Sequence, residues 1–329
     1  MNRQLSRWMV RRPHATRMNA PVRQTRKWFS ICALPVLLTL CAFSQNPGGP
    51  PQSIVFYSAR EGNLNQIYVM DPDGSNQNSV ILDTASDTDP DISSNGKYIA
   101  FKTSPPGPKG TASNILIESL WSGAVWNVTD DTSLFSANEW PRFSPDGKQV
   151  VYDHTPDTRV GVYTIYVADV DGDDPPTALA LGRYPSWSPD GKQIVFRSVN
   201  DIAVVNANGT SKTPTLLTHE SAGSFAQMAN WSPDGGYIAF MSFREGYCSV
   251  FRMKADSSEQ TNLTPKDPAD APAKWCSRAP AWSTNGQEIF FMSFRPSTGG
   301  QSEVFVMNMD GTNVRQLTND GTSGEPRAR

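Results

Sequence analysis

Arginine side chains recur in similar sequence contexts along this chain. Arg60, Arg244 and Arg295 each stand two positions after a serine, and a second set flanks short proline-containing segments. Arginine presents a planar fork of donors that matches carboxylates and other anions. We predict an anion-binding rim formed by Arg60, Arg142, Arg183, Arg244, Arg278 and Arg295. A competing interpretation, in which these arginines form structural ion pairs with the many aspartates, stays open at this stage.

Few residues in the chain have the types and spacing that catalysis or metal binding requires. The three histidines, His14, His154 and His219, are too scattered for a three-histidine metal site. The acidic run 169–174 has its glycine fourth and Ala180 twelfth, whereas a calcium loop needs glycine at its sixth position and glutamate at its twelfth. The nucleophile motif G-x-S-x-G does not occur. We therefore expect no catalytic residue, metal or cofactor.

Two of the four cysteines fall in the N-terminal 44 residues, and Cys248 and Cys276 remain for the rest of the chain. Two cysteines in an exported protein are candidates for a disulfide. The sequence leaves two alternatives open for Cys248 and Cys276, a disulfide or two partly buried thiols.

The chain repeats one phrase six times, with apolar runs that end in aromatic residues. These aromatics are spaced 45, 51, 44, 44 and 51 residues apart: Phe56, Phe101, Tyr152, Phe196, Phe240 and Phe291. Five copies are preceded by a turn phrase, SSNG at 93–96, SPDG at 144–147, 188–191 and 232–235, and STNG at 283–286. A period in this range is typical of repeat architectures.

Each repeat predicts four short strands joined by turns. In 185–218, Pro189-Asp190-Gly191 forms a turn, because proline presets φ and glycine accepts positive φ. The second and third strands are almost continuously apolar, which predicts that both faces of each sheet are buried. Six four-stranded antiparallel sheets arranged radially satisfy this requirement, so we predict an all-β, six-bladed β-propeller.

The two ends of the repeat region complement each other. The first repeat lacks its first strand, and the C-terminal Gly324-Glu325-Pro326-Arg327-Ala328 matches the opening of other repeats, such as 140–143. We therefore expect the C-terminal segment to supply the innermost strand of the first blade. Pairing of the N- and C-terminal segments would then close the ring and remove an exposed edge.

The phrase Pro-x-Trp-Ser-Pro-Asp-Gly-Lys-x-Ile-x-Phe at 185–196 closely resembles the WD-like repeat of TolB-type propellers, as does Ile67–Gly74 with its Asp-Gly hairpin. The resemblance covers nearly all of 53–328 and implies a six-bladed propeller. It also implies a periplasmic protein that binds envelope proteins. We expect neither the α/β domain that precedes the propeller in TolB nor the hydrolase domain that follows such repeats in prolyl-oligopeptidase-type peptidases.

The N-terminal 44 residues carry eight basic and no acidic residues before an apolar stretch, 28–44. This order is typical of a secretory signal peptide, and the apolar stretch is short for a membrane span of about 20 residues. We predict a signal peptide at 1–44, with an alternative start at Met18, then a linker at 45–52 and the propeller at 53–329. Two alternatives are an uncleaved anchor and a lipid anchor through Cys41.

Removal of 1–44 leaves 21 Lys and Arg against 32 Asp and Glu, a net charge near −11. Such a charge argues against nucleic-acid binding, which needs a basic footprint. We expect a monomeric, periplasmic, non-enzymatic propeller without a transmembrane span in the mature chain. It would bind a protein or cell-envelope component on one face. The alternative is a glycan lyase or hydrolase with its site at the channel mouth.

Overall fold

The computed structural model describes residues 53–81, 83–104, 112–133, 135–172, 174–211, 213–265, 276–295 and 298–328. The predicted signal peptide 1–44, with Met18 and Cys41, and the linker 45–52 lie outside these residues. The described residues form 24 β-strands in six four-stranded antiparallel sheets. Within this part of the chain, no helix is long and apolar enough to cross a membrane.

The first three blades combine the C-terminal strand with the N-terminal half of the propeller. Blade 1 contains β24 (Gly324–Ala328), β1 (Ile54–Ser58), β2 (Gln66–Met70) and β3 (Asn78–Ile81). Blade 2 contains β4 (Ser86–Ile92), β5 (Tyr98–Ser104), β6 (Asn114–Ser119) and β7 (Val125–Asn127). Blade 3 contains β8 (Ala137–Phe143), β9 (Gln149–Thr155), β10 (Thr164–Asp169) and β11 (Thr177–Leu181).

The other three blades follow the same order from the inside outwards. Blade 4 contains β12 (Arg183–Trp187), β13 (Gln193–Ser198), β14 (Asp201–Asn206) and β15 (Thr215–Leu216). Blade 5 contains β16 (Ala226–Trp231), β17 (Tyr237–Ser242), β18 (Ser249–Lys254) and β19 (Thr261–Asn262). Blade 6 contains β20 (Cys276–Trp282), β21 (Glu288–Phe294), β22 (Ser302–Asn308) and β23 (Arg315–Gln316).

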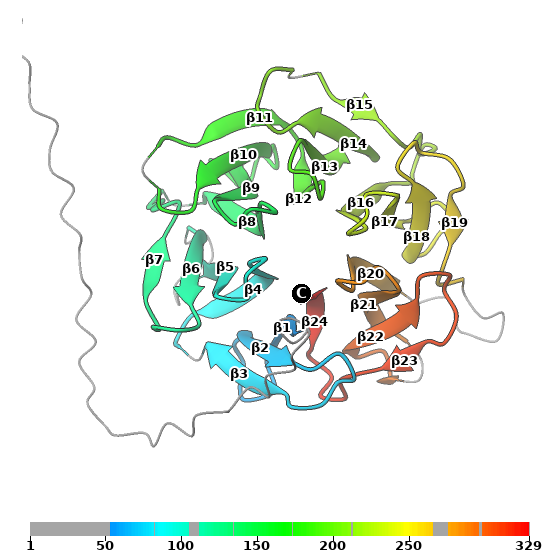
Figure 1. The fold of residues 1–329 in the computed structure, drawn as a ribbon, viewed down its shortest axis with the longest axis horizontal. Coiled ribbons are helices and arrows are strands. Elements are labelled where there is room, and N and C mark those ends of the chain that lie inside the picture. Colours follow the sequence, from blue (N-terminus) through cyan, green and yellow to red (C-terminus); the bar gives the residue numbers. More distant parts are fainter. Residues whose placement is uncertain are drawn as a thin grey trace, which may run out of the picture. The chain divides into compact units, whose positions relative to one another are not determined.

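The six blades surround a common centre, with β24, β4, β8, β12, β16 and β20 innermost (Figure 1). The predicted all-β, six-bladed propeller is confirmed. The turn phrases join the first and second strands, as expected. In blade 4 the amide of Gly191, at φ +70°, donates to Ser188 O at 2.9 Å, and the Ser188 hydroxyl accepts from the amide of Gln193.

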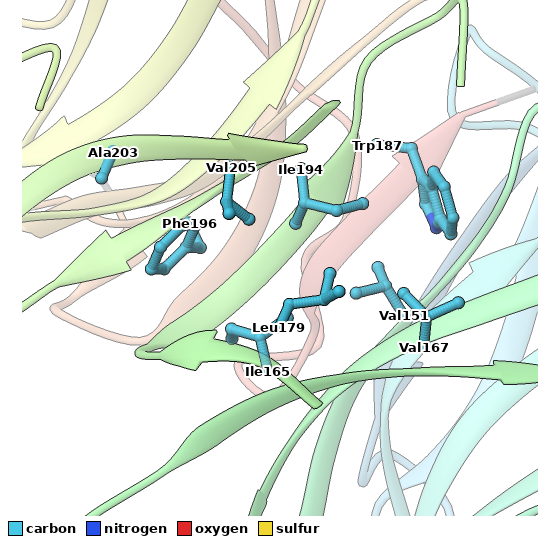
Figure 2. Close-up of a cluster of buried hydrophobic side chains, with 9 residues drawn as sticks. All are labelled: Val151, Ile165, Val167, Leu179, Trp187, Ile194, Phe196, Ala203 and Val205. Atoms are coloured by element: carbon cyan, nitrogen blue, oxygen red, sulfur yellow. The ribbon is translucent and has the colours of Figure 1, made fainter. Parts of the chain in front are cut away.

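Apolar side chains fill the spaces between adjacent blades. Figure 2 shows one such cluster, in which residues of blade 3 (Val151, Ile165, Val167, Leu179) meet residues of blade 4 (Trp187, Ile194, Phe196, Ala203, Val205). Phe196 is fully buried, and so are its repeat counterparts Phe56 and Phe240. Burial of apolar surface stabilises a fold by about 25 cal/mol per Å². Because these side chains are buried between blades, each blade is stabilised mainly by its two neighbours.

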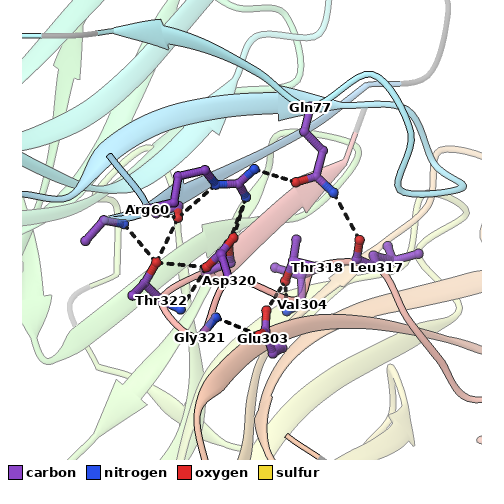
Figure 3. Close-up of polar contacts among 12 residues, drawn as sticks. Arg60, Gln77, Glu303, Val304, Leu317, Thr318, Asp320, Gly321 and Thr322 are labelled. Carbon is purple, nitrogen blue, oxygen red and sulfur yellow. Dashed lines mark hydrogen bonds and ion pairs between the residues drawn. The ribbon is translucent and has the colours of Figure 1, made fainter. Parts of the chain in front are cut away.

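The first blade joins strands from opposite ends of the chain. Strand β24 pairs antiparallel with β1 through Ile54 with Ala328 and Tyr57 with Gly324. Polar contacts extend this junction outwards, because Arg60 forms an ion pair with Asp320 at 2.5 Å and donates to Gln77 at 2.7 Å (Figure 3).

Deletion of 324–329 tests this junction. Without β24 the inner edge of β1 loses its partner, and the exposed backbone groups and apolar surface destabilise the ring. We expect the melting temperature to fall by about 10 °C or more. Calorimetry measures the change, and a melting temperature equal to that of the full chain would contradict the pairing.

Candidate functional site

Each innermost strand contains a β-bulge at the same level of the channel. The pairing register with the second strand shifts there in all six blades. A non-glycine residue with φ between +52° and +58° occupies each bulge: Asp89, Trp140, Tyr184, Met228, Ala279 and Glu325. Positive φ is uncommon outside glycine and is retained where the surrounding structure enforces it. Bulges redirect side chains and are frequent beside functional sites.

Four bulge residues form an apolar cluster in the middle of the ring. Trp140, Met228 and Ala279 are buried together, with Tyr184 packed against them. The rings of Trp140 and Tyr184 meet edge to face, with centroids 4.8 Å apart. Blades 3 and 5 are not neighbours, so the cluster of Trp140 with Met228 crosses the centre.

The other two bulge residues, Asp89 and Glu325, are acidic and lie in adjacent blades, near the pairing of β24 with β1. The amide of Asp89 donates to Glu325 Oε2 at 3.2 Å, and Asp89 Oδ2 accepts from the amide of Trp140 at 3.3 Å. Burial raises the pKa of Glu325 well above its ordinary value, and Asp89 raises it further. The charge of Arg278 opposes this rise. These surroundings therefore favour the protonated form of Glu325 more than water does.

Beyond the bulges, the innermost strands end around a pocket of about 360 Å³. The residues two positions after each bulge line this pocket, and we call them its floor: Asp91, Arg142, Ser186, Asn230, Ala281 and Arg327. The next residue of each strand also lines it, and we call this second set its wall: Ile92, Phe143, Trp187, Trp231, Trp282 and Ala328. The bulge thus determines which side chains face this pocket. All six blades contribute to it.

Two guanidinium groups dominate the electrostatics of the floor. Arg142 and Arg327 are only 4% and 5% exposed. Arg142 Nη1 donates to the carbonyls of Pro141 at 2.5 Å and Asp89 at 3.3 Å, and Arg327 Nη1 donates to Pro326 O at 2.9 Å. Burial lowers the pKa of Arg327 to about 9, and the adjacent charge of Arg142 is the next cause. Two like charges are therefore held close together away from water.

Asp91 is the acidic residue of the same floor. Its Oδ2 accepts from the amide of Phe143 at 2.8 Å. Burial raises the pKa of Asp91, while Arg142 is the main opposing influence. Among the described residues, no carboxylate oxygen lies within 4.0 Å of a guanidinium nitrogen of Arg142 or Arg327. Asp91 moderates the positive charge without forming a direct ion pair.

The tryptophans of the repeat phrase serve two roles. Trp187 and Trp282 are buried between blades, and their indole Nε1 groups donate to the backbone carbonyls of Arg142 and Asn230, both at 3.1 Å. This inter-blade packing is the structural role expected of a repeated residue. One edge of each indole also faces the pocket. Trp231 differs, because its buried Nε1 has no hydrogen-bond partner among the described residues.

Three of the predicted rim arginines pack on their own blades. The guanidinium of each lies over the ring of a third-strand aromatic, at 4.6 to 5.0 Å: Arg60 over Tyr68, Arg244 over Phe251 and Arg295 over Phe305. Arg60 pairs with Asp320, and Arg244 pairs with Glu220 at 2.5 Å. These contacts agree with the competing interpretation of structural ion pairs, while partner binding by these three residues stays a prediction.

The remaining predicted arginines lie nearer the channel. Arg183 pairs with Glu139, which also accepts from Lys102 at 2.5 Å. Arg278 lies over the ring of Phe294 at 5.4 Å. Arg142 alone of the six predicted residues lines the pocket. The structure therefore does not gather the six predicted arginines into one cluster.

The described residues contain no group of three or more His, Cys, Asp and Glu side chains arranged to hold a metal ion. A disulfide joins Cys248 to Cys276, so the strand β20 is tied to the loop before β18. A second cavity of about 360 Å³ lies around His154, which shares a 3.0 Å hydrogen bond with Asn138. Burial lowers the pKa of His154 and favours its neutral form.

The sequence did contain a signal for the pocket. At the start of each repeat, the position after proline (Ala229 in one copy) differs between copies, whereas an apolar residue follows it in all six. That position supplies Asp91, Arg142, Asn230 and Arg327 to the floor. Of these four residues only Arg142 was among the predicted site residues. The spacing of the repeats does not reveal the bulge that brings the side chains at this position to the pocket.

Solved structures with the same architecture include TolB from Acinetobacter baumannii, with 21% identity, a TM-score of 0.67, and 84% of this chain and 66% of that chain covered. The TolB-type propeller is the fold of this chain. Putative TolB from Agrobacterium tumefaciens matches with 20% identity, a TM-score of 0.60, and 85% and 98% of the two chains covered. An oligogalacturonate lyase in complex with manganese matches with 13% identity, a TM-score of 0.51, and 80% and 73% covered.

No family model and no curated protein matches this sequence. This chain spans just under two thirds of the length of the Acinetobacter TolB. Likenesses at 13 to 21% identity show a shared fold and leave the ligand open. The chemistry of the ligand must therefore be inferred from the residues of the channel.

The raised pKa of Glu325 predicts a pH effect on stability. A carboxyl with a higher pKa in the folded than in the unfolded protein binds more protons when folded, so its stabilising contribution is lost as pH rises above about 4.5. We expect Glu325→Gln to make the decline in unfolding free energy between about pH 5 and about pH 8 shallower, by at most about 1.4 kcal/mol per pH unit.

Urea unfolding of the wild type and the variant at several pH values measures this difference. Burial also raises the pKa of Asp87 to about 7 and of Asp153 to about 8, so these residues give both proteins a slope of the same sign. The comparison of the two slopes isolates Glu325. Identical slopes would show that Glu325 is ionised in the folded channel.

Proposed function

We propose that the protein is a non-enzymatic, exported propeller that binds a protein or cell-envelope partner at the pocket where the innermost strands end. The observation that carries this proposal is the composition of the pocket. Two buried guanidiniums and an indole-rich wall face it, and its lining contains no histidine, cysteine or glutamate among the described residues. Such a surface can recognise a ligand, whereas acid–base chemistry needs a paired proton donor and acceptor.

Export is proposed from two features. The basic and then apolar order of 1–44 is that of a signal peptide. The disulfide between Cys248 and Cys276 suits an oxidising compartment such as the periplasm. The mature net charge near −11 favours a soluble protein, and we propose that it acts as a monomer.

The competing proposal is an enzyme that acts on a glycan. The cavity around His154 supports it, because Asp130, Asp131 and two tyrosines also line that cavity. A neutral imidazole can act as a general base. That cavity lies at the junction of blades 2 and 3, away from the six strand ends, and Asn138 occupies one imidazole nitrogen. We therefore favour binding over catalysis.

A bulky substitution at the pocket mouth tests the proposal. Pro233 is exposed and lines the pocket, and non-proline residues Ser94 and Thr284 occupy the same turn position in other blades. Pro233→Trp should therefore leave the fold intact while obstructing the mouth. Pro189→Trp is the matched control, because Pro189 is equally exposed in the equivalent turn but is not a lining residue of the pocket.

The measurement is quantitative capture from envelope extract on the immobilised protein, read by mass spectrometry. We expect one or a few proteins or envelope components to be retained by the wild type and by Pro189→Trp, and to be reduced about tenfold with Pro233→Trp. Equal capture by both variants, or no specific capture by the wild type, would reject the pocket as the partner site.

A further inference from the structure

The two guanidiniums of the pocket floor have no direct ion-pair partner among the described residues. Arg142 and Arg327 are more than nine-tenths buried, and no described carboxylate lies within 4.0 Å of either group. Removing a charge from water is costly unless the charge is paired and hydrogen-bonded. Two adjacent cations in this state indicate that the folded protein leaves a place for an anion.

Arg327 has the larger unused hydrogen-bonding capacity. Its Nη1 donates to Pro326 O, and its buried Nε has no hydrogen-bond partner among the described residues. An unpaired buried donor costs about 1–3 kcal/mol, more when the group is charged. Arg142 is more strongly held, because its Nη1 already donates to backbone carbonyls.

A comparison of the six repeats distinguishes these arginines from the residues that are needed to form the blades. At the equivalent position the six copies contain Asp91, Arg142, Ser186, Asn230, Ala281 and Arg327. The sheets form equally well with serine, asparagine or alanine there. An arginine at this position is therefore not needed for blade formation, which argues that its charge serves a ligand.

The charge balance of the floor suits a monoanion. The two guanidiniums of the floor outnumber its one carboxylate, that of Asp91. The bidentate geometry of arginine matches a carboxylate, and indole and phenyl groups surround the floor with apolar surface. A volume of about 360 Å³ can hold a carboxylate with a short apolar or peptide segment.

We infer that this pocket binds a carboxylate group, held between Arg142 and Arg327, with the adjoining part of the ligand against the indoles. This inference rests on the proposed function, since it names the chemistry by which the partner is recognised at the same site. The carboxylate can come from a peptide C-terminus or from an acidic side chain.

Isothermal titration calorimetry of the purified protein with short peptides distinguishes these sources. The probes are N-acetyl-Ala-Ala-Ala as free acid and as amide, N-acetyl-Ala-Glu-Ala-amide and its glutamine counterpart, and inorganic phosphate. We expect one or both carboxylate probes to bind at least about tenfold more tightly than their amide counterparts. Binding of the free acid alone assigns a C-terminus, and binding of the glutamate peptide assigns a side chain.

Variants tie this binding to the pocket. We expect Arg327→Gln to weaken carboxylate binding about tenfold or more. Should Arg327→Gln not fold, Pro233→Asp provides a second test, with Pro233→Asn as its neutral match. The added negative charge at the mouth should weaken binding severalfold relative to Pro233→Asn, and less so at high salt.

The inference would be overturned by equal affinity for acids and amides, by tighter binding of phosphate than of either carboxylate, or by wild-type affinity in a folded Arg327→Gln. Failure of all probes would also overturn it. The capture experiment separates this failure from that of the proposed function, because a partner lost with Pro233→Trp would still establish the pocket as a binding site that uses other chemistry.

Discussion

The bulge in each innermost strand is the constraint on which the centre of this propeller depends. It holds six non-glycine residues at positive φ, which costs about 1–3 kcal/mol for each residue. Such a strained backbone conformation persists only where the surrounding structure fixes it firmly. The bulge directs Trp140 towards the centre of the ring and Glu325 towards Asp89 of the next blade. It also places Arg142 and Arg327 in the pocket lining at the strand ends. The blades repeat, but the side chains that the bulges place at the centre do not.

Much of the fold could be predicted from the sequence. The apolar runs that end in Phe196 and Phe291 form second strands as expected, and β13 and β21 each continue past the aromatic residue. Both faces of these strands are buried, so a continuous apolar run identified them without ambiguity. The outer strands were harder to define, since β15, β19 and β23 have only two residues each and expose much of their surface.

The candidate site could be predicted only in part. Alternation of side chains along a strand predicts which face a residue occupies, but one inserted residue reverses that assignment beyond the bulge. Arg142 was therefore expected at a rim and instead lies buried at the floor of the pocket, while Arg60 and Arg244 pack on aromatic rings. A repeat period contains no information about these directions. The likeness to TolB structures at about 20% identity shows the architecture and not the ligand.

A crystal structure of the protein with N-acetyl-Ala-Ala-Ala would test the central claim most directly. We expect the carboxylate of the peptide to lie about 3 Å from guanidinium nitrogens of both Arg142 and Arg327, with its alanine methyl groups against the indoles. This expectation would be contradicted if the two arginines were instead paired with Asp91 or Asp89 and the peptide were bound elsewhere or absent.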